Sequence, residues 1–294
     1  MHLLLGDRDD LVCAGVLARM AARGLTTHIV LAPLAPPARL VWRLDDEGLT
    51  SRYAWSGAPQ EAKIASVLVR DAGWLDPSGW APEDHAYMQA EVQATLLAWL
   101  EGLPCPVINR CPAALWYRPR MPLLAWRTLI RRCGLPAAET IITNDPAEAR
   151  DFARRVASGG VVYTPLTGAS GYLVAGDSAW HGLAGVQARA PVCLTEPHGA
   201  ARPACVVGGR VIWDDVPEPD VEALEPGLRR LAQLAGLDFV EVAVAPLRRG
   251  TAVVMVDPAP RLEHFRAAAR DRILDALVAA LLLDPAPVAA EVQP

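Results

Sequence analysis

The chain has 294 residues and a formal net charge of −5, with 52% hydrophobic and 21% charged residues. This composition is typical of a globular protein of about two or three subdomains, and it argues against wholesale disorder. Acidic and basic residues are interspersed, so the sequence lacks the clustered basic face that nucleic-acid binding requires.

The N-terminal part predicts a Rossmann-like domain. An apolar strand at 2–5, an amphipathic helix that ends at Gly24 and a strand at 27–31 form a βαβ unit. A strand at 66–70, a helix at 83–100 and a short strand at 107–109 extend it. The loop after the first strand is rich in aspartate and lacks GxGxxG, so a dinucleotide site is not expected there.

A Pro- and Arg-rich linker follows at 111–122. Arg118 and Arg120 lie next to Trp116 and Tyr117, a combination suited to binding a carboxylate, a phosphate or an acidic peptide. The alternative is a strap between domains that is packed by its aromatic side chains.

The next segment predicts a β-hairpin with a glycine-containing tip. After a helix at 123–133, a strand at 139–143 and a helix at 147–156, β-prone residues at 161–163 lead into Thr164 and Pro165. Gly168 and Gly171 then precede a second β-prone run at 172–174. Bare backbone at such a tip is suited to folding over a ligand such as a phosphate chain.

The C-terminal part predicts strands at 192–195, 204–207 and 211–213, a helix at 221–234, a hairpin of 238–245 with 251–256, and a final helix that ends at 283. The cysteines form no CxxC pair and no secretory segment is recognised, so we expect a cytoplasmic protein with reduced thiols. The apolar, Trp-rich first part makes a homodimer plausible.

Six short stretches, in order, resemble the ATP-grasp superfamily, in particular the branch of ribosomal-protein-modifying glutamate ligases and glutathione synthetases. They are 134–140, 161–171, 192–196, 205–212, 236–239 and 254–260. The resemblance implies an α/β (α+β grasp) fold: a Rossmann-like pre-ATP-grasp domain at 1–109 and grasp lobes at 110–195 and 196–284, with a flexible tail at 285–294. It also implies ATP and magnesium as cofactors, and a small carboxylate, a peptide or a protein as the partner.

The resemblance also implies site residues. Glu196 would hold the adenine, while Thr164, Gly168, Gly171, Arg118 and Arg120 would surround the phosphates, and Asp257 would bind the metal. Two lysines of the family are missing: one position falls near Pro122 or Leu123 and the other is Thr164. Of the three metal-binding positions, two are Ala243 and Met255. Glu241, on the same face as Ala243, can substitute only if the register shifts.

Three functional hypotheses remain open. The first is a binding or accessory module with a degenerate nucleotide and metal site in a bacterial biosynthetic or peptide-modification system. The second is an active carboxylate–amine ligase rebuilt from Arg118, Arg120, Glu241 and Asp257. The third is a peptide-binding scaffold that uses no nucleotide. The chain has a single lysine, Lys63, and this bias against lysine would explain arginine at a position where the family has lysine. It does not explain a threonine at the hairpin position, Thr164, or a methionine at a metal-binding position, Met255.

Overall fold

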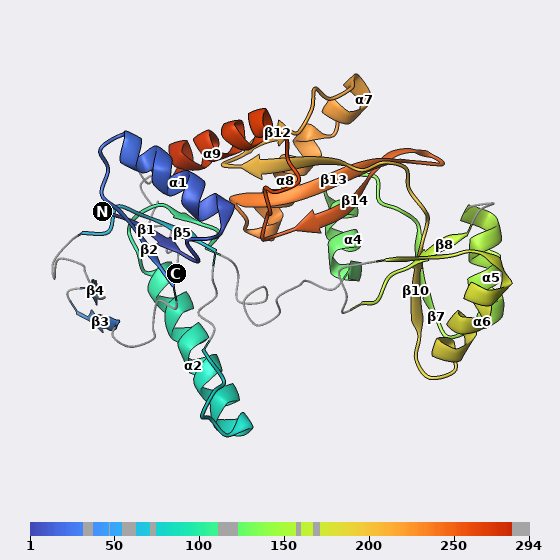
Figure 1. The fold of residues 1–294 in the computed structure, drawn as a ribbon, viewed down its shortest axis with the longest axis horizontal. Coiled ribbons are helices and arrows are strands. Elements are labelled where there is room, and N and C mark those ends of the chain that lie inside the picture. Colours follow the sequence, from blue (N-terminus) through green and yellow to red (C-terminus); the bar gives the residue numbers. More distant parts are fainter. Residues whose placement is uncertain are drawn as a thin grey trace.

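A computed structural model gives the fold, and it describes residues 1–31, 38–46, 48–54, 63–70, 75–110, 123–156, 160–166 and 171–283. These residues form three four-stranded sheets and a separate two-stranded hairpin, arranged along the long axis of the molecule (Figure 1). The predicted tail at 285–294 lies outside the described residues.

The first sheet is parallel, with the order β2-β1-β5-β6. Its strands are β1 (His2–Leu5), β2 (Thr27–Val30), β5 (Ser66–Val69) and β6 (Val107–Ile108). Helix α1 (Leu11–Ala22) connects β1 to β2, and α2 (Pro82–Glu101) connects β5 to β6. Since parallel strands are covered on both faces, β1 and β5 are apolar and buried along most of their length.

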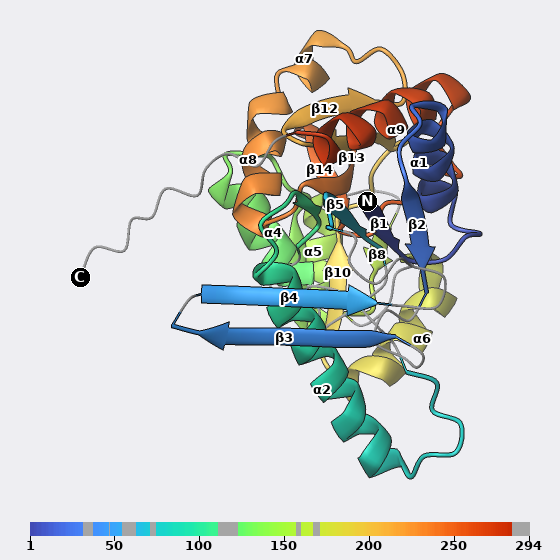
Figure 2. The same ribbon diagram turned by 90° about the vertical axis from the view of Figure 1, so that its left-hand side faces the viewer.

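The hairpin of β3 (Arg39–Asp45) and β4 (Gly48–Ala54) pairs only with itself in the part of the chain that the structure describes. Figure 2 shows it beside α2. The Tyr53 ring lies 4.9 Å from the Trp99 ring of α2, and both side chains are buried. These aromatic contacts attach the hairpin to the first subdomain.

The second sheet is antiparallel, with the order β7-β10-β8-β9. Its strands are β7 (Thr140–Thr143), β8 (Val161–Tyr163), β9 (Tyr172–Val174) and β10 (Val192–Thr195). Helices α5 (Pro146–Val156) and α6 (Gly176–Gln187) cover one face, where Phe152, Val161, Leu183 and Leu194 form the core. The other face is free of these two helices.

The third sheet has the order β12-β11-β13-β14. It contains β11 (Arg202–Val207), β12 (Arg210–Trp213), β13 (Phe239–Leu247) and β14 (Gly250–Asp257). Helices α4 (Leu123–Arg132) and α8 (Glu225–Ala235) pack on one face, and α9 (Ala267–Leu281) packs on the other.

One predicted helix is divided in the structure. The helix expected at 221–234 appears as α7 (Pro219–Glu222) and α8, with a break before Glu225. Pro226 has no N–H to donate into a preceding turn, but it is well tolerated in the first turn of a new helix. The proline therefore ends one helix and begins the next.

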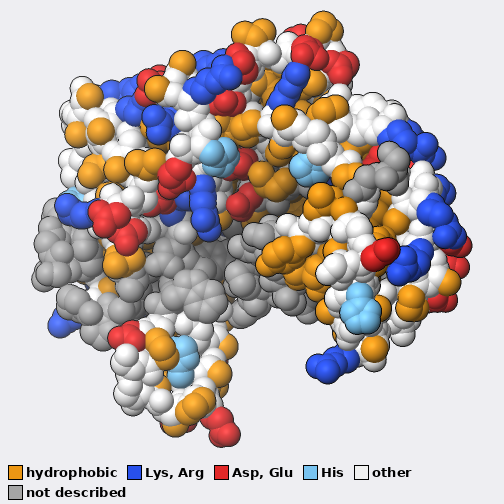
Figure 3. Space-filling view, turned by 45° about the vertical axis from the view of Figure 1, so that its right-hand side comes forward, with side chains coloured by type: hydrophobic (Ala, Val, Ile, Leu, Met, Phe, Trp, Pro, Cys, Tyr) orange, Lys and Arg blue, Asp and Glu red, His pale blue; other side chains and the backbone are white. Residues whose placement is uncertain are grey.

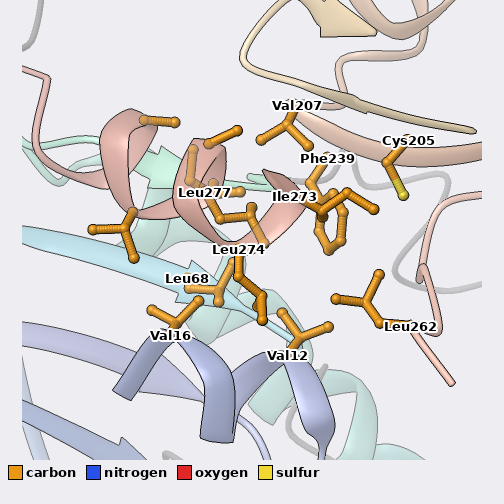
Figure 4. Packing of buried hydrophobic residues seen from close by; sticks show 14 of the residues in the cluster. Val12, Val16, Leu68, Cys205, Val207, Phe239, Leu262, Ile273, Leu274 and Leu277 are labelled. Carbon is orange, nitrogen blue, oxygen red and sulfur yellow. The ribbon is translucent and has the colours of Figure 1, made fainter. Parts of the chain in front are cut away.

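The first and third sheets share one hydrophobic core (Figure 4). Leu274 and Leu277 of α9 pack with Val12 and Val16 of α1, and Phe239 lies in the same cluster. At the end of β6, the buried Asn109 side chain accepts a hydrogen bond from the Phe239 N–H (2.8 Å) and donates one to the Phe239 carbonyl (2.7 Å). These contacts hold the two sheets in a fixed relation.

In the part of the chain that the structure describes, every helix is too short or too polar to span a bilayer. The cysteines among those residues are all buried and unpaired.

Candidate functional site

The candidate residues lie on the second and third sheets. Figure 3 shows the surface hollowed between the lobe of β7–β10 and the rest of the molecule. Arg118, Arg120 and Gly168 lie outside the described residues. Of the two candidate positions for the first lysine, Pro122 also lies outside them, whereas Leu123 begins α4.

Thr164 extends the ladder between β8 and β10, because its N–H donates to the Cys193 carbonyl at 2.9 Å. Val192 and Leu194 belong to the core under α5 and α6, so alternation places Cys193 and its cross-strand neighbour Thr164 on the opposite face. The position of the missing hairpin lysine is therefore a neutral hydroxyl on the face of the second sheet that lies opposite α5 and α6.

Gly171 lies against the same strand. A Cβ atom on Gly171 would come within 2.5 Å of the Val162 side chain and 3.4 Å of the Thr164 hydroxyl. The close approach between the two strands of the hairpin thus requires glycine at this position. Gly171 sets the shape of the hairpin next to Thr164.

Glu196 follows β10 and is 4% exposed. Its Oε2 accepts from the Glu139 N–H (3.4 Å) and its Oε1 accepts from the Arg248 N–H (3.2 Å), while its own N–H donates to the Glu139 carbonyl (2.9 Å). Since Arg248 lies in the turn between β13 and β14, this carboxylate joins the second sheet to the third. The structure thus gives Glu196 a role in connecting the two sheets, and its contact with a nucleotide stays a prediction.

Glu139 adds a second connection between the same two sheets, which the sequence analysis did not single out. Its carboxylate forms ion pairs with Arg155 of α5 and with Arg249 of the β13–β14 turn, the latter at 2.9 Å. Arginine and glutamate at these positions look like ordinary surface charges in the sequence, because the three residues are far apart along the chain.

Few of the side chains at the expected metal-binding positions on β13 and β14 carry an oxygen atom. Ala243 pairs with Met255, and Glu241 pairs with Asp257. Cross-strand neighbours lie on one face with Cβ atoms about 4.5–5.5 Å apart, so Glu241 and Asp257 are direct neighbours on this face. Among the described residues no group of three histidine, cysteine, aspartate or glutamate side chains is arranged to hold a metal ion.

Both carboxylates of this pair already have hydrogen-bond partners. Glu241 is 1% exposed; its Oε1 lies 2.8 Å from His264 Nε2, and its Oε2 accepts from the Arg261 N–H at 3.3 Å. Asp257 Oδ1 accepts from the Ala259 N–H at 2.8 Å. Burial raises the pKa of Glu241, and the interactions with His264 and Arg261 oppose this shift.

Arg127 of α4 is a further charged residue, beside the third sheet, and the sequence analysis missed it. Its side chain is buried, and Nη1 donates to the Val253 carbonyl of β14 at 2.9 Å. Its Nε is buried and has no hydrogen-bond partner among the residues that the structure describes. Because a helical arginine usually reaches solvent, only the tertiary structure distinguishes it from its neighbours.

Comparison with known proteins places this geometry in context. No protein-family model and no curated protein matches the chain. Among solved structures, macrocyclase MdnC from Microcystis aeruginosa MRC, bound with precursor peptide MdnA, is 14% identical with a TM-score of 0.75, over 96% of this chain and 99% of that one.

Two further structures are similar over nearly the whole chain. ATP-grasp ligase PsnB, complexed with precursor peptide PsnA2 and AMPPNP, is 20% identical with a TM-score of 0.74, covering 95% of this chain and 98% of that chain. A RiPP-associated ATP-grasp ligase from Chryseobacterium gregarium, in complex with ADP and a leader and core peptide, is 15% identical with a TM-score of 0.73, covering 97% of each chain. Together with the three sheets described above, these similarities confirm the predicted fold: the chain has the same α+β fold as these ATP-grasp ligases.

Proposed function

We propose that this ATP-grasp-fold protein binds a nucleotide between its two grasp lobes without activating a carboxylate, and that it is a binding or accessory module in bacterial peptide modification. The nucleotide would contact Glu196, Thr164, Gly168, Gly171, Arg118 and Arg120, with Asp257 as the one remaining metal ligand. In this proposal the domains are 1–109, 110–195 and 196–284, and the protein acts in the cytoplasm.

The pairing of Ala243 with Met255 supports this proposal most strongly. Activating a carboxylate as an acyl phosphate requires cations, usually magnesium held by oxygen ligands, to neutralise the triphosphate. A methyl group and a thioether supply no such ligand. Thr164 likewise replaces a cation with a neutral hydrogen-bonding group.

The peptide part of the proposal is supported by the similar structures. MdnC, PsnB and the C. gregarium ligase were each solved with a precursor peptide or with leader and core peptides. PsnB was also solved with magnesium and ADP. A chain that retains this fold but lacks the charged positions is suited to holding a peptide for another enzyme.

The experiment is a turnover assay with the full chain, ATP, magnesium and pooled synthetic peptides rich in Asp, Glu, Lys, Ser and Thr. PsnB with PsnA2 is the positive control. We expect no ADP above background and no peptide that has lost water, while anisotropy of labelled peptides reports binding. Peptide-dependent ADP formation would overturn the proposal, and so would the absence of any peptide binding.

A second candidate, an active ligase, is favoured by one observation: Glu241 lies directly opposite Asp257. Two adjacent carboxylates can hold a divalent cation if Glu241 exchanges its contact with His264 for the metal. This ligase would also use Arg118 and Arg120. It predicts magnesium-dependent ADP formation that is lost in Asp257→Ala, whereas the first proposal predicts no ADP from either protein.

A further inference from the structure

We propose that Arg127 is an anion-binding residue that takes a phosphate group of the nucleotide, in place of the charge missing at Thr164. This inference rests on the proposed nucleotide binding and goes beyond it, because it assigns the charge to a helix residue outside the positions that the resemblance implies.

The first observation is that the Arg127 charge is buried without a paired carboxylate among the described residues. The side chain is 9% exposed, yet no ion pair with a carboxylate is found for it among the described residues, and Nε has no acceptor. Within the part of the chain that the structure describes, its side chain makes one hydrogen bond, to the neutral Val253 carbonyl. A buried guanidinium normally has a paired anion. A buried N–H donor without an acceptor therefore points to a ligand that supplies the anion.

The second observation is where the guanidinium lies. Figure 1 shows α4 beneath the third sheet, on the side of the β7–β10 lobe. The hydrogen bond to Val253 places Arg127 at β14, and its charge also acts on Cys193 of β10. Burial raises the pKa of Cys193, and the Thr195 hydroxyl and the Arg127 guanidinium oppose that shift. Arg127 therefore lies beside β14, and its charge is felt at Cys193 of β10.

This position connects Arg127 to the hairpin. Cys193 is the cross-strand neighbour of Thr164, the position where the resemblance implies a lysine. Arg127 also lies one helical turn after Leu123, the other lysine position, on the same side of α4. One guanidinium thus serves the region that two lysines would serve in the family.

The chemistry favours a phosphate. A guanidinium presents several donors in a plane and matches phosphate oxygens with two parallel hydrogen bonds. Arg127 already uses Nη1 on Val253, and its buried Nε has no acceptor among the described residues, so Nε is the donor offered to the ligand. A carboxylate of a peptide offers similar oxygens, so the test includes both kinds of anion.

The test measures binding by calorimetry without magnesium, using ATP, inorganic pyrophosphate, adenosine and an aspartate-rich peptide as probes. Arg127→Met removes the charge and retains a long apolar side chain. Arg131→Met is the matched control, because Arg131 is exposed on the same helix. We expect at least a tenfold loss of ATP and pyrophosphate affinity in R127M only, with adenosine binding unchanged in both variants.

A second variant keeps the inference testable if R127M does not fold. Arg127→Lys keeps the buried charge but replaces the planar set of donors by a single nitrogen, so it loses the paired hydrogen bonds to a phosphate. We expect it to weaken pyrophosphate binding, while Arg131→Lys, at an exposed site on the same helix, leaves it intact.

The outcomes separate this inference from the proposed function. Equal ATP affinity in the wild type and R127M would refute the role of Arg127 and leave nucleotide binding in place. A wild type that binds neither ATP nor pyrophosphate would refute both. Loss of the aspartate-rich peptide alone in R127M would show a carboxylate site and overturn the phosphate assignment. ADP formation would overturn only the proposed function.

Discussion

Replacing Glu241 by glutamine is expected to stabilise the protein increasingly as the pH rises. Glu241 is 1% exposed, and burial holds its pKa above the usual value of 4.5. When the pH rises above 4.5, the unfolded chain loses this proton while the folded chain still retains it. The free energy of unfolding therefore falls with pH until the folded-state pKa is passed.

The magnitude follows from the pKa difference. Each unit by which the folded-state pKa exceeds the unfolded value lowers the stability of the wild type by about 1.4 kcal/mol at pH values above both. Glutamine has no proton to lose, and its carbonyl can still accept from the Arg261 N–H, which lies 3.3 Å from the carboxylate. The advantage of Glu241→Gln should thus be absent at low pH and reach a plateau at high pH.

The assay is urea unfolding from about pH 4 to about pH 8, with Glu263→Gln as the control at an exposed site next to His264. The difference between E241Q and the wild type should grow with pH, whereas E263Q should follow the wild type. A difference that is constant or that shrinks with pH would refute the argument that burial governs this carboxylate.

Three structural substitutions test the framework around the site by urea unfolding. Asn109→Ala should cost about 3–5 kcal/mol, because it leaves the buried N–H and carbonyl of Phe239 without partners; a loss below about 1 kcal/mol would contradict this. Gly171→Ala should cost about 1–3 kcal/mol through its contact with Val162, and an unchanged midpoint would show that the hairpin can relax. Glu196→Ala should cost about 1–3 kcal/mol, since two main-chain N–H groups lose their acceptor; a drop in ATP affinity with unchanged stability would instead favour a pure nucleotide contact.

Most of the fold can be read from local patterns in the sequence. Apolar runs such as 2–5 and 66–69 predict buried parallel strands, and glycines such as Gly236 end helices in a left-handed conformation. Even the division of α7 from α8 has a local signal in Pro226. These features depend on residues close together in the chain, so the sequence contains the information.

The site is less accessible to such reasoning because it depends on register and on distant contacts. Glu241 faces Asp257 only because β13 and β14 pair in one register, which shifts after Ala243. The bond between Glu241 and His264 joins residues 23 positions apart, and no local pattern in the sequence pairs them. Arg127 and Arg131 cannot be distinguished by residue type; the burial of Arg127 beside β14 separates them.

The most direct test of the account is calorimetric titration of the full chain with ATP, once with magnesium and once with a chelator. We predict that ATP binds with similar affinity in both conditions and that no ADP forms, because the paired Ala243 and Met255 hold no metal. Binding that requires magnesium, accompanied by ADP formation, would contradict the account and favour the ligase. Absence of binding in both conditions would contradict it in favour of a peptide-binding scaffold.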